Sequence, residues 1–101
     1  MSQYFIAYIG GDQSTSPEEG KLNFSKYMEW LNSLGEAAIS PMNPFKTTRT
    51  VKPDGSVTGG SSMAMSGFTI IEAESMDTAL ALVMNCPFLE INGALEVSEL
   101  A

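Results

Sequence analysis

The 101-residue sequence contains no histidine and only one cysteine, Cys86. Without an imidazole, His-based acid–base chemistry, catalytic triads and zinc sites of the Cys/His kind are excluded. A single thiol cannot form an internal disulfide. Cys86 also lacks the positive surroundings that produce a reactive thiolate, so we expect it to be buried and inert. The sequence therefore predicts no metal site, no cofactor and no assignable catalytic residue.

Basic residues are scarce as well. Five Lys and Arg stand against twelve Asp and Glu, which gives a formal net charge of -7. This charge would repel a phosphate backbone, so we expect no nucleic-acid partner. All five basic residues precede residue 53, where five acidic residues balance them, so the second half of the chain carries the whole net charge of -7. The acidic half predicts a solvated surface, with the binding of a cation or a basic partner as the alternative.

Long apolar runs are missing too. The apolar segment from Tyr4 to Ile9 is too short for a signal peptide or a membrane span. We therefore expect a cytoplasmic protein with no membrane partner. The length corresponds to a single domain, residues 1–101, and the content of 44% hydrophobic and 17% charged residues is that of a chain that folds.

A helix is predicted from about residue 17 to residue 34. Ser16 can cap its free amides, Pro17 suits its first position, and Glu19 completes a capping box. Gly35 can adopt the left-handed conformation that ends it. Its apolar residues recur at spacings of three and four and form one stripe: Phe24, Tyr27, Met28, Leu31 and Leu34.

Four segments have the composition of strands: residues 4–9, 36–45, 67–73 and 94–100. The prolines in 36–45 confine that strand to a sheet edge or to a short length. Residues 47–51 run into a Pro-Asp-Gly-Ser turn and predict an additional small hairpin. Residues 59–66 are rich in glycine and serine and predict an irregular loop, either a mobile lid or a connector.

A second helix is expected to begin after Ser75, which can cap it, and to end before Pro87. Few of its positions are polar, so it should be largely buried. The order of elements predicts an α+β, ferredoxin-like βαββαβ fold with one added hairpin. Right-handed crossovers place both helices on one face of the sheet. Strand 4–9 is apolar on both faces, which predicts a symmetric homodimer with its sheets packed face to face.

Three segments of the second half resemble a known family: residues 67–82 (GFTIIEAESMDTALAL), 85–89 (NCPFL) and 93–97 (GALEV). The Gly-Gly-Asp turn at 10–12, the helix start at 16–19 and the region from residue 30 to 41 extend the likeness over most of the chain. The sequence thus resembles the YCII-related family of small dimeric α/β-barrel proteins. The loop at 57–66 departs from it, because it lacks the Asp-Gly-Pro-Phe motif of many members.

The resemblance implies a ferredoxin-like subunit, a homodimer, and a cleft between sheet and helices that holds a small molecule. In some relatives a His and Asp pair is proposed as catalytic. This chain has no histidine, so no catalytic pair can be carried over.

Five residues are candidates for contact with such a ligand. Tyr8 and Tyr27 can each place a hydroxyl in an apolar cavity, although core tyrosines with one satisfied polar tip look the same. Asp12 follows a Gly-Gly turn, where it could face a cleft or simply form an Asx turn. Glu72 would be a possible acid or base if its strand face is buried, and a solvated carboxylate otherwise. Met65 could fold over a ligand as part of a lid.

Three functions follow from these observations. The first is a dimeric small-molecule-binding domain without an assignable reaction. The second is an enzyme acting on small organic acids or lactone-like substrates, with Asp12, Glu72 or a tyrosine in place of the missing histidine. The third is a module that docks to another protein through the acidic half, in which case binding would weaken steeply with salt.

Overall fold

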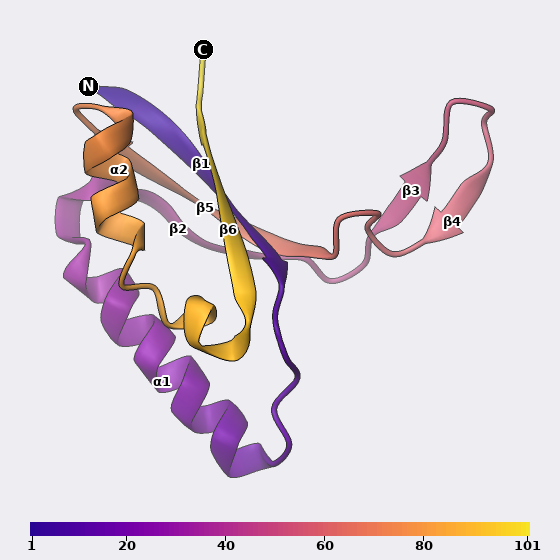
Figure 1. Ribbon diagram of the computed structural model, residues 1–101, viewed down its shortest axis with the longest axis horizontal. Helices are drawn as coiled ribbons and strands as arrows, with labels where there is room; N and C mark the ends of the chain where they lie inside the picture. The colour runs from indigo at the N-terminus through magenta and orange to yellow at the C-terminus, as the bar shows by residue number, and fades with distance from the viewer.

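A computed structural model describes residues 1–101 and contains one four-stranded antiparallel sheet with two helices on one face (Figure 1). The α+β, ferredoxin-like order with an added hairpin is confirmed. The core elements are β1 (Ser2–Gly10), α1 (Pro17–Ser33), β2 (Ala38–Pro44), β5 (Met65–Ala73), α2 (Met76–Val83) and β6 (Gly93–Glu99). The hairpin is β3 (Arg49–Val51) with β4 (Val57–Gly59), and two 3-10 turns are η1 (Gly35–Ala37) and η2 (Pro87–Ile91).

The strand order in the sheet is β2-β5-β1-β6. β1 lies in the centre because it pairs along its length with both β5 and β6. β2 lies at an edge, as its prolines predict, since proline has no amide to donate to a second neighbour. Its pairing with β5 is irregular at two places, before and after Ser40.

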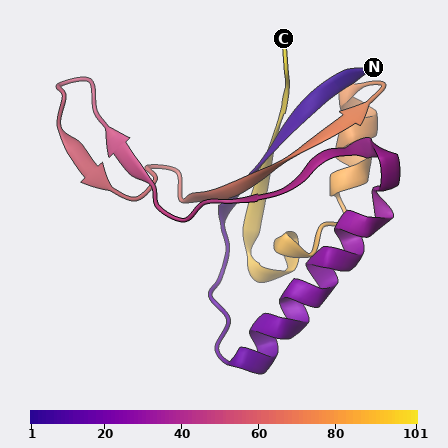
Figure 2. The same ribbon diagram turned by 180° about the vertical axis from the view of Figure 1, so that it is seen from behind.

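The hydrophobic core lies between the sheet and the helices, which Figure 2 shows from behind on the same side of the sheet. Successive side chains of a strand alternate between faces, and β1 directs Tyr4, Ile6 and Tyr8 toward the helices. All three are buried. Trp30 and Leu31 of α1 pack against them, together with Ile71 and Ala73 from β5 and Ala79 and Val83 from α2.

The ends of α1 follow the local sequence signals. The hydroxyl of Ser16 accepts from the backbone N–H of Glu19 over 3.1 Å, and Gly35 adopts the predicted positive φ of 56°. The helix ends at Ser33, one residue before the predicted end. A complete capping box also requires the Glu19 carboxylate to accept from the backbone N–H of Ser16. This part of the prediction is wrong, because the carboxylate accepts from the hydroxyl of Thr15 instead.

The second helix is shorter and less buried than predicted. α2 spans eight residues and is capped by Ser75, whose hydroxyl accepts from the N–H of Thr78. Only Ala79 and Val83 are buried, and Met84 just beyond its end is 69% exposed. One helical face suffices to cover this end of the sheet, so the remaining apolar residues stay partly in solvent. The turn η2 that follows was not predicted.

The short α2 does not extend along the N-terminal half of α1, and Figure 1 shows α1 diverging from the sheet there. The apolar stripe of α1 is consequently buried only at its C-terminal end, at Leu31 and Leu34. Phe24, at the other end of the stripe, is 55% exposed. The space between this part of α1 and the sheet becomes the pocket described below.

The hairpin β3–β4 is confirmed, and it projects away from the rest of the molecule (Figure 1). The predicted loop 59–66 is too long, because β4 extends to Gly59 and β5 begins at Met65. The remaining loop, residues 60–64, is held in place by hydrogen bonds. The N–H of Gly10 donates to the carbonyl of Ala64, and the hydroxyl of Ser61 accepts from the N–H groups of Met63 and Met65. Neither helix of this chain is long and apolar enough to cross a membrane.

Candidate functional site

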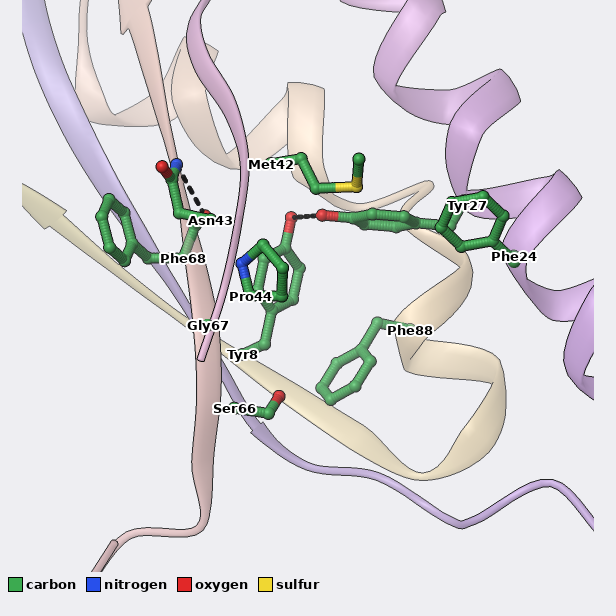
Figure 3. A pocket seen from close by; sticks show the side chains of 10 residues that line it. All are labelled: Tyr8, Phe24, Tyr27, Met42, Asn43, Pro44, Ser66, Gly67, Phe68 and Phe88. Atoms are coloured by element: carbon green, nitrogen blue, oxygen red, sulfur yellow. Dashed lines mark hydrogen bonds between the residues drawn. The ribbon is translucent and has the colours of Figure 1, made fainter. Parts of the chain in front are cut away.

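A pocket opens between α1, the turn η2 and the β2–β5 side of the sheet (Figure 3). Its cavity volume is about 270 Å³. Ten residues from five elements line it, with Phe68 contributing its backbone while its ring points to the other face of the sheet: Tyr8, Phe24, Tyr27, Met42, Asn43, Pro44, Ser66, Gly67, Phe68 and Phe88. No member of this set carries a charge, so the pocket is neutral throughout.

Two tyrosines meet inside this pocket. The hydroxyl of Tyr27 donates to the hydroxyl of Tyr8 over 2.9 Å, and their rings pack edge to face at 5.7 Å (Figure 3). The Tyr8 hydroxyl is also 2.5 Å from the hydroxyl of Thr69, which donates to the backbone carbonyl of Pro41 over 2.6 Å. A chain of three hydroxyls therefore runs from α1 through the sheet to its edge strand.

The direction of this chain follows from its proton count. Each hydroxyl carries one hydrogen, and the hydrogen of Thr69 is used on Pro41. Tyr8 must then donate to Thr69, and Tyr27 must donate to Tyr8. No protein group donates to the oxygen of Tyr27, so the chain ends in the pocket with a free acceptor. A ligand can complete it by offering a hydrogen-bond donor at this point.

Tyr8 holds its proton firmly. Burial, the largest cause, raises the pKa of the Tyr8 phenol well above its ordinary value. The phenol is therefore neutral at physiological pH. It serves to orient its neighbours rather than to accept a proton.

Phe88 forms one wall of the pocket, and two glycines make room for it. Its ring packs edge to face on Tyr8, with ring centroids 5.3 Å apart. A Cβ on Gly93 would lie 2.3 Å from two carbons of the Phe88 ring, and a Cβ on Gly11 would lie 2.9 Å from two others. Phe88 is not predicted as a site residue from the sequence, because no local pattern connects it to glycines in two other segments.

Gly67 allows a similar close approach on the other wall. A Cβ there would lie 2.7 Å from the backbone oxygen of Asn43. The amide of Asn43 donates to the carbonyl of Phe68 over 3.2 Å and to the carbonyl of Ser40 over 3.1 Å. These bonds hold the irregular edge strand β2 against β5 beside the pocket.

The structure brings together two of the five predicted ligand contacts, Tyr8 and Tyr27. Asp12 is exposed outside the lining, where its carboxylate accepts from the side-chain amide of Asn92 over 2.6 Å. Glu72 pairs with Gln3 and alternates with buried Ile71, so it lies on the sheet face away from the helices. Met65 pairs with Ile9 at the start of β5 and is not part of the lining.

Other reactive groups lie outside this pocket. Cys86 is buried, as predicted, and burial raises the pKa of its thiol to about 11. Lys26 and Glu90 line an adjoining cavity of about 240 Å³ that shares Phe24, Tyr27 and Phe88 with the pocket, and their charged groups face each other at 3.8 Å. No group of three or more Cys, Asp or Glu side chains lies close enough together to hold a metal ion.

The fold and the pocket define a small ferredoxin-like α+β subunit with a neutral aromatic cavity between sheet and helix. Among solved structures it is similar to 5-chloro-2-hydroxyhydroquinone dehydrochlorinase (TftG) from Burkholderia phenoliruptrix AC1100 in complex with 2,5-dihydroxybenzoquinone. The identity is 28%, the TM-score is 0.55, and the match covers 97% of this chain and 93% of that one. No protein-family profile and no curated protein sequence matches. The YCII-like resemblance is thus supported at the level of the fold.

Proposed function

We propose that this protein binds a small, uncharged aromatic molecule that carries a hydroxyl group, in the pocket between α1 and the sheet. The observation that carries the proposal is the hydroxyl chain ending in a free acceptor on Tyr27, inside a lining without charge. Aromatic walls favour a flat apolar body, and a few placed polar groups fix its orientation. The acceptor selects a ligand that offers a donor.

The size of the pocket supports the same class of ligand. Its volume of about 270 Å³ lies just below the range of pockets that hold drug-sized molecules, so the ligand should be of about one ring. The similar protein TftG was solved with 2,5-dihydroxybenzoquinone, a single ring with two hydroxyls. That ligand belongs to TftG, and its size agrees with the volume of this pocket.

Binding is favoured over catalysis because the lining holds no group that would exchange a proton near neutral pH. The carboxylates considered for catalysis, Asp12 and Glu72, lie outside the lining. Tyr8 has a raised pKa, which makes it a poor proton donor. A carboxylate ligand would also meet no cation there, so a small organic acid fits the pocket less well than a neutral phenol.

We further propose that the protein works as a homodimer in the cytoplasm. The sheet face away from the helices, called the open face below, carries Phe5, Ile9, Phe68 and Ile70, with the rings of Phe5 and Phe68 stacked at 4.8 Å. Its apolar side chains are only partly buried, and a monomer rarely leaves such a patch in water. The resemblance to the YCII-related family of small dimeric α/β-barrel proteins also implies a homodimer. The free, unpaired thiol of Cys86 supports a reducing compartment.

The binding proposal is tested by calorimetry with hydroquinone, its dimethyl ether and benzoate. We expect hydroquinone to bind more tightly than the ether by about two- to tenfold, the value of one neutral hydrogen bond, and benzoate to bind weakest. In a Tyr27→Phe variant the preference for hydroquinone over the ether should shrink. Tyr4→Phe is the matched control, because the Tyr4 side chain lies on the same face of the sheet as Tyr8 but outside the pocket. Equal affinities for all three compounds, or tightest binding of benzoate, contradict the proposal.

A further inference from the structure

Residues 46–60, called the hairpin arm below, project from the body of the molecule without covering any part of it (Figures 1 and 2). Every residue from Val51 to Gly60 is exposed. A two-stranded hairpin on its own is marginally stable at best in water. The arm nevertheless has an ordered tip, where Asp54 accepts from the hydroxyl and the N–H of Ser56 at 2.7 and 2.9 Å. We therefore expect the arm to pack against another surface.

One face of the arm is apolar and cationic. Arg49 and Val51 alternate with Thr50 along β3, and Val51 lies directly opposite Val57 of β4. These two valines are 70% and 54% exposed. Thr50 and Thr58 form the opposite, polar face. The arm therefore presents a valine pair with an adjacent guanidinium on one side only.

Basic and acidic residues are distributed unevenly between the arm and the rest of the molecule. The arm holds three of the five basic residues, Lys46, Arg49 and Lys52, and one of the twelve acidic residues, Asp54. Its net charge is thus +2, and the rest of the chain carries -9. The four strands of the main sheet contain no lysine and no arginine at all. The open face nevertheless carries two carboxylates, Glu72 on β5 and Glu96 opposite Ala7 on β6.

These carboxylates would destabilise a dimer in which two open faces pack together. Two such faces packed together would bring four carboxylates close to an apolar interface with no cation from either sheet. Burying unpaired charge is costly, and like charges across an interface repel. A cation must come from elsewhere in the assembly, and the arm is the cationic element of this chain.

We propose that the hairpin arm of each copy crosses to a second copy of this chain, buries its Val51–Val57 face there, and supplies cations to Glu72 and Glu96 of the open face. The proposal rests on the homodimer proposed above. The residues from Arg49 to Asp54 extend over about 20 Å at about 3.3 Å per residue, which places the tip of the arm well away from its own sheet. Arm and open face are thus complementary parts of one interface between two copies.

The test is a charge swap on the full-length chain, read by analytical ultracentrifugation as a dimer dissociation constant. Arg49→Glu alone, and Glu72→Lys with Glu96→Lys, should each weaken the dimer at least tenfold. Mixing the two variants should restore dimerisation, because each arm then meets an open face of opposite charge. Val51→Glu should weaken the dimer as well, and Thr50→Glu, which adds the same charge on the other face of the arm, is its matched control.

The possible outcomes separate the two proposals. Restored dimerisation in the mixture, with Val51→Glu more disruptive than Thr50→Glu, supports the crossing arm. A wild-type dimer whose dissociation constant is unchanged by Arg49→Glu and Val51→Glu overturns the arm and leaves the homodimer standing. A wild-type chain that stays monomeric at all concentrations overturns both. Circular dichroism of each variant verifies that it is folded, and a variant that fails this check is replaced by Arg49→Gln or Val51→Thr.

Discussion

The ring of Phe88 occupies the space that a side chain at Gly93 would fill, with two ring carbons 2.3 Å from the position of a Cβ. Phe88 belongs to the turn η2, and Gly93 is the first residue of β6. The same ring stands edge-on to Tyr8, so the glycine determines where one wall of the pocket lies. A residue with no side chain thereby shapes a site that it does not line.

Gly93→Ala is expected to displace Phe88 and to destabilise the fold by about 1–3 kcal/mol, the usual cost of forcing an extra carbon into a packed site. Urea unfolding measures the loss. Gly59→Ala is the matched control, since the space around Gly59 is open and its φ is not positive. An equal effect of the two substitutions would show that Phe88 does not depend on Gly93.

Tyr8→Phe should cost more stability than Tyr27→Phe. Removing the middle hydroxyl leaves buried Thr69 without its donor and Tyr27 without its acceptor, at about 1–3 kcal/mol. Removing the terminal hydroxyl breaks one bond at the edge of the pocket, at roughly 0.5–1.5 kcal/mol. Unfolding followed by Trp30 fluorescence ranks the two variants, and the reverse ranking would contradict the direction assigned to the hydroxyl chain.

Cys86 makes stability depend on pH on the alkaline side. Its thiol has a pKa of about 11 in the folded protein, raised by burial, and about 8.5 in an unfolded chain. Between these values the unfolded chain has lost the proton that the folded chain keeps. The free energy of unfolding should therefore be unaffected by this group below about pH 8.5 and should fall as the pH rises toward 11.

Cys86→Ala isolates the effect of this thiol, because every other titrating group is the same in wild type and variant. The difference in unfolding free energy between wild type and variant should shrink steadily from pH 8.5 to pH 11, measured by urea denaturation at each pH. A constant difference across that range would mean that the thiol ionises as easily in the folded protein as in the unfolded chain.

Trp30 joins the two helices through one hydrogen bond. Its indole N–H donates over 3.1 Å to the carbonyl of Leu82, one of the last carbonyls of α2, which has no partner within its own helix. Trp30→Phe should destabilise the fold by about 1–3 kcal/mol and raise amide exchange at the end of α2. Phe24→Leu, at an exposed position of the same helix, should have little effect on either measurement.

Much of the fold could be predicted because its signals are local. Ser16 and Pro17 mark a helix start, Gly35 marks a helix end, and the Pro-Asp-Gly-Ser turn marks a hairpin, whatever the rest of the chain does. Each of these signals depends on the conformational preference of one or two residues. The structure confirms all three within one residue.

The candidate site was harder to predict from the sequence, because its residues come from segments far apart in the chain. Tyr8 and Tyr27 were recognised singly, but the bond between their hydroxyls depends on how α1 crosses the sheet. Glu72 lies on the face of Phe68 and Ile70, away from the helices. Which face the helices cover could not be read from β1, because both of its faces are apolar.

In the binding proposed above, the absence of charge around the end of the hydroxyl chain would also make the pocket selective for the protonation state of its occupant. A phenol can donate to Tyr27, but its conjugate base cannot. The anion would have to turn the Tyr27 proton away from Tyr8 and would meet no cation in the lining. Because only the neutral form fits, binding raises the pKa of the ligand. A bound phenol is therefore released as the pH rises past its own pKa, while the pocket itself stays unchanged.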